Sequence, residues 1–215
     1  MIEQKIPTIS ELQKRVILTE NEINGIIRKQ AHKIAPYLIK HAIHILYTVT
    51  VLNGASYYAA KLIPALGEAV TSLDKKYRLH IVEDNLIASR YGPKTSSSRA
   101  VKIIKDLKHN INGKYVLVIE DIADKCVTLR GVISHLKAMK PTNIMVSVLI
   151  KREGINRINH NQVWVGYRLE GDEWICGFGL DYAELYRELK MIIAVKKQFC
   201  SDYMTDKIKK CLQYE

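Results

Sequence analysis

The chain has 215 residues, of which 47% are hydrophobic, and carries a formal net charge of +11. This size and composition allow one α/β domain with a real core, or such a domain with a small appendage. They exclude a membrane-spanning helix, because no apolar run approaches the roughly 18 residues that one needs. The positive charge fits binding of nucleic acid or of polyanionic small molecules, or simply a solvated basic surface.

The N-terminus and the cysteines indicate a cytoplasmic protein. The first 15 residues contain acidic side chains and lack an apolar centre, unlike a secretory signal. The cysteines are scattered without a CxxC pair, and they are Cys126, Cys176, Cys200 and Cys211. We therefore expect reduced thiols, with neither a disulfide framework nor a zinc site.

The first part of the chain predicts two strand–helix pairs. Residues 15–18 form a candidate short strand, and Thr19 with Glu22 three residues later is a capping box that begins a helix. One stripe of that helix carries Ile23, Ile26, Ile27, Ala31, Ile34 and Leu38. Residues 45–52 are rich in β-branched side chains, as in a buried strand, and an apolar helix follows over residues 57–66.

Two segments in the middle of the chain have weaker patterns. Residues 78–82 are a poorly bounded candidate strand. Residues 89–98 (SRYGPKTSSS) are polar, basic and rich in turn formers. This composition suits either a mobile lid over a site or a plain surface hairpin tip.

Residues 115–139 have the clearest organisation. They open with the unbroken apolar run YVLVI, typical of a strand covered on both faces. Glu120 and Asp121 follow at the expected strand end, Asp124 begins a turn, and helical spacing starts at Thr128. One face of that helix carries Leu129, Val132, Ile133, Leu136 and Met139. Ligands of open α/β sheets bind at such strand ends, so this βα unit is the first candidate for a site.

The side chains of this turn suit a sugar phosphate. The vicinal carboxylates of Glu120 and Asp121 can hold ribose hydroxyls and Mg²⁺, which prefers oxygen ligands. Asp124 can take or hold a proton near a reacting group. Thr128 and the free N–H groups of a helix N-terminus can hold a phosphate. The alternative is a solvated strand end without chemistry.

The last third of the chain predicts further short elements. Residues 143–150 form a candidate strand, and residues 163–167 and 174–178 form two more. Residues 181–190 have the pattern of a helix, and the tail beyond residue 196 is basic and weakly patterned.

The stretch VLVIEDIADKCVTL resembles the phosphoribosyl-pyrophosphate-binding motif of the type I phosphoribosyltransferases. That motif has four apolar residues, two acids, two apolar residues and then Asp-Thr-Gly-x-Thr. Glu120, Asp121, Asp124 and Thr128 match it, and the Glu-Asp pair is similar to the 6-oxopurine branch of the family. The resemblance implies that Asp124 is the catalytic residue, in contact with N7 of the purine. It also implies that the substrate is bound by the turn residues Lys125, Cys126, Val127 and Thr128.

The resemblance extends from about residue 16 to residue 189. Leu52-Asn53-Gly54 stands at the pyrophosphate-binding loop, where the family usually has Leu-Lys-Gly with a cis peptide bond after the leucine. Ser89 and Tyr91 stand at matching places of the lid motif Ser-Ser-Tyr-Gly, which implies substrate contacts for both.

Three further matches lie in the last third of the chain. Lys151 resembles the lysine that reads the 6-oxo group of the purine. Trp174 and Ile175 are similar to the pair that stacks on the base and contacts it through the main chain. By the same resemblance, Asp181 would contact a second Mg²⁺ and Arg187 would contact the pyrophosphate.

The resemblance implies a type I phosphoribosyltransferase-like α/β fold, with a central parallel sheet flanked by helices. We expect a core at about residues 15–155, a hood at about 156–190 with residues 1–14, and a basic tail at about 191–215. The implied function is purine salvage: Mg²⁺-dependent transfer of the 5-phosphoribosyl group from phosphoribosyl pyrophosphate to hypoxanthine or guanine, giving IMP or GMP and pyrophosphate. The implied metal ligands are Glu120, Asp121 and Asp181. A homodimer or homotetramer is expected, with no nucleic-acid or membrane partner.

Two departures from the family pattern concern phosphate binding. Lys125-Cys126 stands where the family has Thr-Gly, and a Cβ at the glycine position can force a different loop path. Asn53 replaces the lysine of the pyrophosphate loop, which removes a cation but leaves the backbone donors. These departures and the charge of +11 leave a second interpretation open, a catalytically altered regulator of the same fold that binds nucleotide and RNA or DNA.

Overall fold

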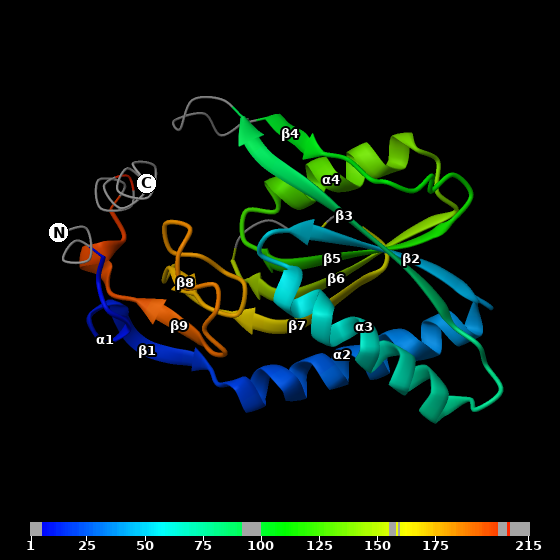
Figure 1. Ribbon diagram of the computed structural model, residues 1–215, viewed down its shortest axis with the longest axis horizontal. Helices are drawn as coiled ribbons and strands as arrows, with labels where there is room; N and C mark the ends of the chain where they lie inside the picture. Colours follow the sequence, from blue (N-terminus) through cyan, green and yellow to red (C-terminus); the bar gives the residue numbers. More distant parts are fainter. Residues whose placement is uncertain (1–5, 92–99, 155–157, 159, 202–205, 207–215) are drawn as a thin grey trace. The chain divides into compact units, whose positions relative to one another are not determined.

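The structure, a computed structural model, describes residues 6–91, 100–154, 158, 160–201 and 206 (Figure 1). The chain divides into two compact units. The smaller unit joins Met1–Asn24 with Gly171–Glu215, and the larger unit is Gly25–Glu170.

The larger unit contains the expected central parallel sheet. Its six strands are β2 (Ile45–Leu52), β3 (His80–Tyr91), β4 (Ala100–Lys105), β5 (Tyr115–Ala123), β6 (Asn143–Arg152) and β7 (Val163–Leu169). They lie in the order β4-β3-β2-β5-β6-β7, and all pairs are parallel except the edge pair β3–β4. Because β2, β5 and β6 are central and covered on both faces, most of their residues are buried without alternation.

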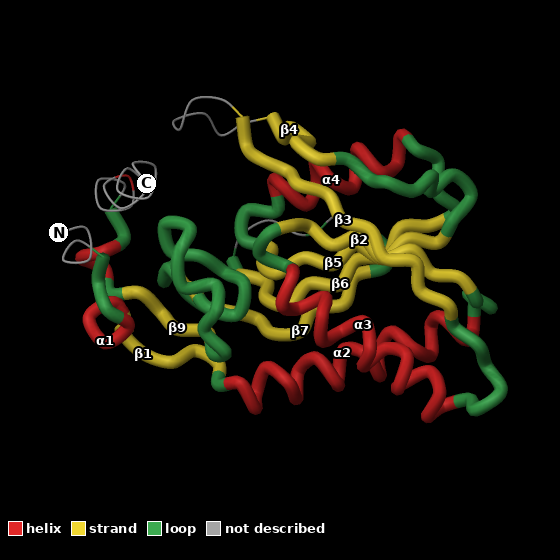
Figure 2. The backbone as a smooth tube through the Cα atoms, viewed as in Figure 1, coloured by secondary structure: helices red, strands yellow, loops and turns green. Residues whose placement is uncertain are grey.

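Helices cover both faces of this sheet (Figure 2). α3 (Ser56–Leu73) and the part of α2 (Glu20–Lys40) that belongs to the larger unit cover one face, and α4 (Val127–Ala138) covers the other. The predicted capping box of α2 is confirmed, since the Thr19 backbone N–H donates to Glu22 Oε2 at 2.8 Å and the Glu22 N–H donates to Thr19 Oγ1 at 3.3 Å. Because β2, β5 and β6 are parallel neighbours, the turns that follow β2 and β5 lie along one edge of the sheet.

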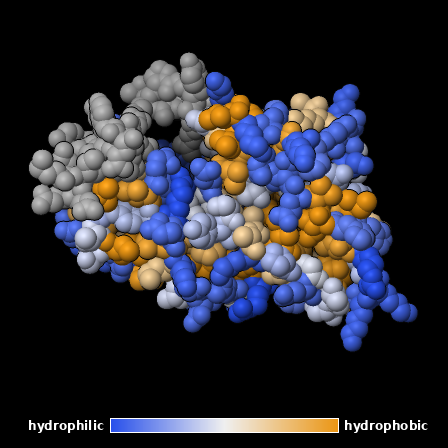
Figure 3. All heavy atoms as spheres, in the orientation of Figure 1, coloured by the Kyte–Doolittle hydropathy of each residue, from blue (hydrophilic) through white to orange (hydrophobic). Residues whose placement is uncertain are grey.

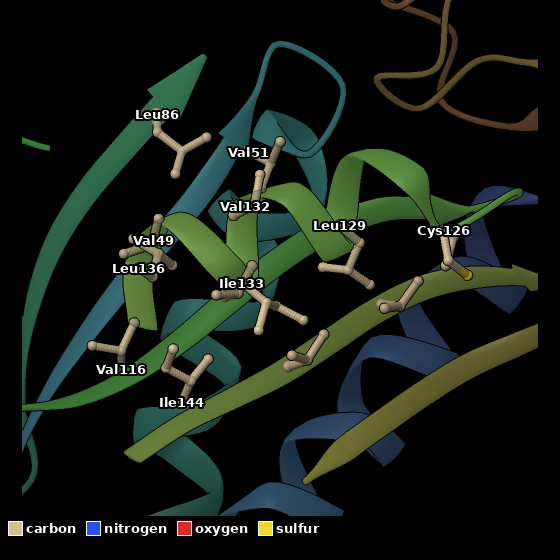
Figure 4. Packing of buried hydrophobic residues seen from close by; sticks show 14 of the residues in the cluster. Val49, Val51, Leu86, Val116, Cys126, Leu129, Val132, Ile133, Leu136 and Ile144 are labelled. Carbon is tan, nitrogen blue, oxygen red and sulfur yellow. The ribbon is translucent and has the colours of Figure 1, made fainter. Parts of the chain in front are cut away.

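The core under α4 combines two periodicities (Figure 4). The helix contributes its predicted apolar stripe, and every second residue of the central strands points toward it. The buried helix residues are Leu129, Val132, Ile133 and Leu136. The strand residues packed against them include Val49, Val51, Val116, Val118, Val146 and Val148. This packing fixes the start of α4 against the end of β5.

A buried polar network lies on the opposite face. The amide nitrogen Nε2 of Gln30 donates to the Tyr58 hydroxyl at 3.0 Å and to the backbone oxygen of Val148 at 3.1 Å. The Tyr58 hydroxyl lies 2.7 Å from Ser147 Oγ. All three side chains are buried, so these bonds tie α2 and α3 to β6 where water cannot compete.

The smaller unit has a three-stranded antiparallel sheet in the order β1-β9-β8. Its elements are α1 (Ile9–Leu12), β1 (Gln13–Leu18), β8 (Ile175–Cys176), β9 (Ile192–Val195) and the 3₁₀ helix η2 (Lys197–Phe199). Glu173 accepts hydrogen bonds from Arg15 at 2.6 Å and Lys14 at 2.7 Å. These bonds lower the pKa of Glu173 to about 2, and the bond from Arg15 has the larger effect.

The helix predicted over residues 181–190 is wrong. This segment forms turns, with isolated bridges that pair Gly177 with Leu180 and Tyr182 with Leu185. The backbone is left-handed at Ala183, Glu184 and Tyr186. An α-helix cannot continue through such residues, because each reverses the sign of φ.

Other element predictions need changes of length. The helix expected to end at residue 66 continues to Leu73, and the strand expected at 78–82 runs from His80 to Tyr91. The strand expected at 174–178 is reduced to Ile175–Cys176. β4, β9 and α1 were not predicted.

The surface view shows separate apolar patches among hydrophilic residues on the face that Figure 3 presents. Across the described residues, no helix is long and apolar enough to cross a membrane.

Candidate active site

The candidate site lies at the carboxyl-terminal edge of β2, β5 and β6 in the larger unit. These strands are neighbours and parallel, so their ends meet at one edge. The turns β2–α3 and β5–α4 leave the sheet there.

The β2–α3 turn has the expected backbone. The peptide bond between Leu52 and Asn53 is cis. A Cβ at Gly54 would lie 1.8 Å from Oδ2 and 2.7 Å from Cγ of Asp121, so only glycine fits while that carboxylate stays in place. The Ser56 hydroxyl donates to the Asn53 carbonyl at 2.7 Å, and the Asn53 side chain is exposed. The structure thus brings the predicted pyrophosphate loop directly against the predicted acidic strand end.

The vicinal acids Glu120 and Asp121 are both buried, at 6% and 8% exposure. Successive strand side chains point to opposite faces. Asp121 lies on the α3 face against Gly54, and its Oδ1 accepts from the Ile122 N–H at 2.7 Å. Glu120 therefore points to the α4 face, with Val118. Among the described residues, no group of three or more His, Cys, Asp or Glu side chains could hold a metal, so an ion here would need ligands from a substrate or water.

Asp124 is held by a residue that the sequence did not single out. Arg152 Nε donates to Asp124 Oδ1 at 2.8 Å. The Arg152 side chain is 8% exposed and the Asp124 side chain 36%. The sequence placed Arg152 beside Lys151 at the end of a predicted strand. Its contact with Asp124 joins the ends of two different strands, so no pattern of neighbouring residues could have predicted it.

Cys126 occupies the position where the family has glycine, and it keeps a backbone that favours glycine. Its φ and ψ are 55° and 13°, in the left-handed region, and it is the N-cap residue of α4. Its side chain is buried in the core under α4 rather than projecting from the turn (Figure 4). The added Cβ is accommodated without loss of the left-handed turn.

The thiol of Cys126 is unsuited to nucleophilic attack. Burial raises its pKa, although the charges of Arg130 and Lys151 act in the opposite direction. Burial also raises the pKa of Cys176 to about 12. Neither cysteine provides a thiolate near neutral pH.

The start of α4 presents a basic turn. The Arg130 backbone N–H donates to the Cys126 carbonyl at 3.0 Å, which closes the first helical turn. Arg130 Nη2 lies 3.4 Å from the Lys125 carbonyl oxygen, and both long side chains are exposed. Val127 and Thr128 form the first residues of the helix and are partly exposed. Exposed cations beside a helix N-terminus favour an anion there.

Lys151 lies near the end of β6, with a side chain that is 12% exposed. Its Nζ lies 3.6 Å from Glu153 Oε1 and donates to the Arg152 carbonyl at 3.3 Å. Arg168 holds the same Glu153 oxygen at 2.5 Å. The ammonium group is therefore oriented at the strand end by two acceptors.

Ser89 and Tyr91 belong to the end of β3 and not to a loop. Their backbones pair with Lys102 and Ala100 of β4. Residues 92–98 of the predicted lid lie outside the described residues.

The remaining predicted residues belong to the smaller unit. Trp174 is 41% exposed and contacts the Tyr182 ring edge-on, at a centroid distance of 6.4 Å. Ile175 is buried in β8. Arg187 Nη2 pairs with Asp181 Oδ1 at 3.0 Å and with Glu184 Oε2 at 2.9 Å.

Arg187 and Asp181 are thus brought together. Arg187 Nη1 also donates to the Gly179 carbonyl at 2.8 Å, and Asp181 Oδ2 accepts from the Glu184 N–H at 2.9 Å. The guanidinium group is fixed by this turn and not by a helix face.

A mostly parallel sheet with paired acids at one strand end and a helix N-terminus beyond them defines a type I phosphoribosyltransferase fold. A family model described as "Phosphoribosyl transferase domain" matches residues 20–183, and the chain belongs to this family.

Curated relatives cover most of the chain. A hypoxanthine-guanine phosphoribosyltransferase of Mycobacterium avium is 31% identical over 182 residues, which are 83% of this chain and 84% of the relative. One of the same name from Staphylococcus aureus (strain Mu50) is 30% identical over 190 residues, 88% of this chain and 97% of the relative.

Solved structures agree in fold. A ternary substrates complex of a mutant hypoxanthine phosphoribosyltransferase from Trypanosoma cruzi is similar with a TM-score of 0.76 and 26% identity, covering 89% of this chain and 100% of that one. The hypoxanthine phosphoribosyltransferase of Staphylococcus aureus gives 0.75 and 29%, covering 90% and 96%.

Proposed function

We propose that this protein is a purine-salvage enzyme that transfers the 5-phosphoribosyl group of phosphoribosyl pyrophosphate to N9 of hypoxanthine or guanine. The products are IMP or GMP and pyrophosphate. The observation that carries the proposal is the contact between two motifs, where the β2–α3 turn at Gly54 lies against Asp121 of the acidic strand end. The names and coverage of the relatives support the same reaction.

Each part of the substrate has a suitable group in the larger unit. The carboxylates of Glu120 and Asp121 would accept hydrogen bonds from the ribose hydroxyls. The 5′-phosphate would bind the N–H groups of the turn at residues 125–128, next to the exposed cation of Lys125. The β2–α3 turn at Asn53 and Gly54 would bind the pyrophosphate through its backbone.

The purine would be read at two atoms. Lys151 would donate to the 6-oxo group, since its ammonium lies at the strand end with two acceptors that orient it. Asp124 would accept the proton that purine N7 loses as the bond at N9 forms. Fixed charges near the ribose would stabilise the positive charge that develops as pyrophosphate leaves.

Magnesium fits the residues at this strand end. The ion prefers oxygen ligands and usually takes one or two carboxylates together with substrate phosphates and water. Glu120 and Asp121 are two buried carboxylates of this kind. When bound, the ion would neutralise charge on the leaving pyrophosphate.

Several expectations stay predictions. The roles that the resemblance gives to Trp174, Ile175, Asp181 and Arg187 concern the smaller unit. The substrate contacts of Ser89 and Tyr91, the cytoplasmic location and the homodimer or homotetramer also stay predictions.

The second interpretation, a regulator that binds nucleotide and RNA or DNA, is not favoured. The acids, Lys151 and Gly54 of the β2–α3 turn are all present, and the relatives that cover the chain are named for the enzyme. The net charge alone fits a basic surface as well as a nucleic-acid partner.

The test is an assay of the purified protein with Mg²⁺, phosphoribosyl pyrophosphate and hypoxanthine, guanine or xanthine in turn. Formation of IMP or GMP is the expected result. Absence of any nucleotide product with all three bases, from protein shown to be folded, would overturn the proposal.

A further inference from the structure

Arg152 is unusual among the cations of this protein. Of the lysines, arginines and histidines that the structure describes, it alone is buried. Burial of a charge is costly unless a partner of opposite sign offsets it. The carboxylate of Asp124 is such a partner, 2.8 Å away.

The contact restrains one oxygen of Asp124 and leaves the other available. Arg152 Nε donates to Oδ1. Within the described part of the chain, no residue bonds to Oδ2. The Asp124 side chain is 36% exposed, so that oxygen can be reached by a ligand while the carboxylate stays oriented.

The scaffold on the two sides of the contact differs in rigidity. Arg152 ends β6, whose backbone pairs with β5 on one side and with β7 on the other. Asp124 follows the last residue of β5, on the turn to α4. A carboxylate on a turn samples several rotamers unless a neighbour holds it, and proton-handling groups need a fixed geometry.

We propose that Arg152 is a positioning residue that sets the orientation of Asp124 toward purine N7. This inference rests on the proposed function and adds a residue to it. Arg152 does not touch the substrate in this role, because it acts through the carboxylate. Its loss should therefore lower kcat in the same step that Asp124 serves.

The experiment compares Arg152→Gln, Asp124→Asn and the double variant in steady-state transfer to hypoxanthine. Arg152→Gln should lower kcat about tenfold or more, with KM for phosphoribosyl pyrophosphate within about threefold of the unaltered protein. The double variant should be no slower than Asp124→Asn, because both changes remove one function. Arg78→Gln is the matched control, since it removes an exposed arginine that donates to the backbone carbonyls of Lys75 and Tyr77 ahead of β3, and its kcat should stay within about twofold.

The outcomes separate the two proposals. If the unaltered protein makes no nucleotide, the proposed function fails and this inference fails with it. If the unaltered protein is active and Arg152→Gln changes only KM, or leaves kcat unchanged, the inference alone is overturned. Losses that multiply in the double variant would also overturn it, since Arg152 would then act independently of Asp124.

A second measurement covers the case in which Arg152→Gln does not fold. In ¹⁵N-labelled full-length protein, the Nε–H resonance of Arg152 should be protected from solvent exchange. Asp124→Ala should shift this resonance and remove the protection. A resonance that Asp124→Ala leaves unchanged would overturn the inference.

Discussion

The turn between β5 and α4 has two halves that would bind ligand by different means. The acidic half, residues 120–124, presents side chains that neighbours hold: Gly54 lies against Asp121, and Arg152 pairs with Asp124. The phosphate half, residues 125–128, presents backbone N–H groups at the start of α4, and its left-handed residue is Cys126. The acidic half matches the family motif residue by residue, while the phosphate half differs from it at two positions.

The difference shows what each kind of site demands. A site built from side chains depends on the identity of each residue. A site built from backbone N–H groups depends on backbone conformation, so a residue can be replaced if the new side chain can be packed without changing that conformation. The side chain of Cys126 packs in the core under α4. We therefore expect substitutions in the acidic half to cost far more activity than substitutions in the phosphate half.

The largest effect is expected for Asp124→Asn. The amide keeps the shape of the carboxylate but cannot accept the proton from purine N7, so kcat should fall by about 10²–10³-fold. KM for phosphoribosyl pyrophosphate should change less than about threefold, because the phosphate half is untouched. Steady-state kinetics with hypoxanthine measure both. A kcat within twofold of the unaltered protein would remove Asp124 from the chemistry.

Gly54→Ala should be the next most damaging change. The added Cβ would lie 1.8 Å from Asp121 Oδ2, so the carboxylate must move away from the substrate side of the turn. We expect at least about a tenfold loss of kcat/KM. Thermal unfolding and activity are measured together.

Gly67→Ala is the control for that change. A Cβ at Gly67 in α3 has nothing within 4 Å, so this variant should keep full activity. It should gain about 0.5–1 kcal/mol of stability, since alanine is the better helix former. Equal losses in the two variants would mean that the glycine at position 54 has no special contact.

The phosphate half can be tested with two substitutions at Cys126. Cys126→Gly should leave KM for phosphoribosyl pyrophosphate within about twofold, because glycine adopts the same left-handed backbone freely. Cys126→Val should destabilise the protein by about 1–2 kcal/mol and raise that KM, because a β-branched residue disfavours this conformation. Chemical denaturation and steady-state kinetics give both quantities. If both variants behave alike, the backbone conformation at residue 126 does not control phosphate binding.

The smallest effect is expected for the exposed Lys125. Its ammonium is screened by water, so Lys125→Thr should raise KM for phosphoribosyl pyrophosphate only about two- to fivefold and leave kcat unchanged. Adding Asn53→Lys in the same chain should recover part of the loss, because it restores a cation at the pyrophosphate loop. A loss of kcat in Lys125→Thr would show that this side chain acts in the chemistry.

The sequence predicted best where one pattern covers a whole βα unit. The apolar run before Glu120 and the helical spacing from Leu129 to Leu136 both report burial, which the fold confirms. The helix expected at residues 181–190 was wrong because the backbone is left-handed at Ala183, Glu184 and Tyr186. A glycine would have indicated that conformation in the sequence, but none of these residue types does.

The contacts that arrange the candidate site were beyond sequence reasoning. Arg152 and Asp124 are 28 residues apart and meet only because β5 and β6 are neighbours in the sheet. The contact of Gly54 with Asp121 likewise depends on β2 lying beside β5. The sequence motifs identified Gly54, Asp121 and Asp124, but the pairing of β5 with β2 and β6 decides which side chains these residues contact.

A crystal structure of the full chain with IMP is the decisive test of the roles given to the two halves of this turn. The 5′-phosphate should accept hydrogen bonds from backbone N–H groups of residues 125–128, with φ of Cys126 still positive and its thiol still in the core. Asp124 should place Oδ2 at purine N7 while Oδ1 keeps its bond to Arg152. A phosphate bound away from this turn, or a turn rebuilt with negative φ at Cys126, would show that the backbone of residues 125–128 is not the phosphate site.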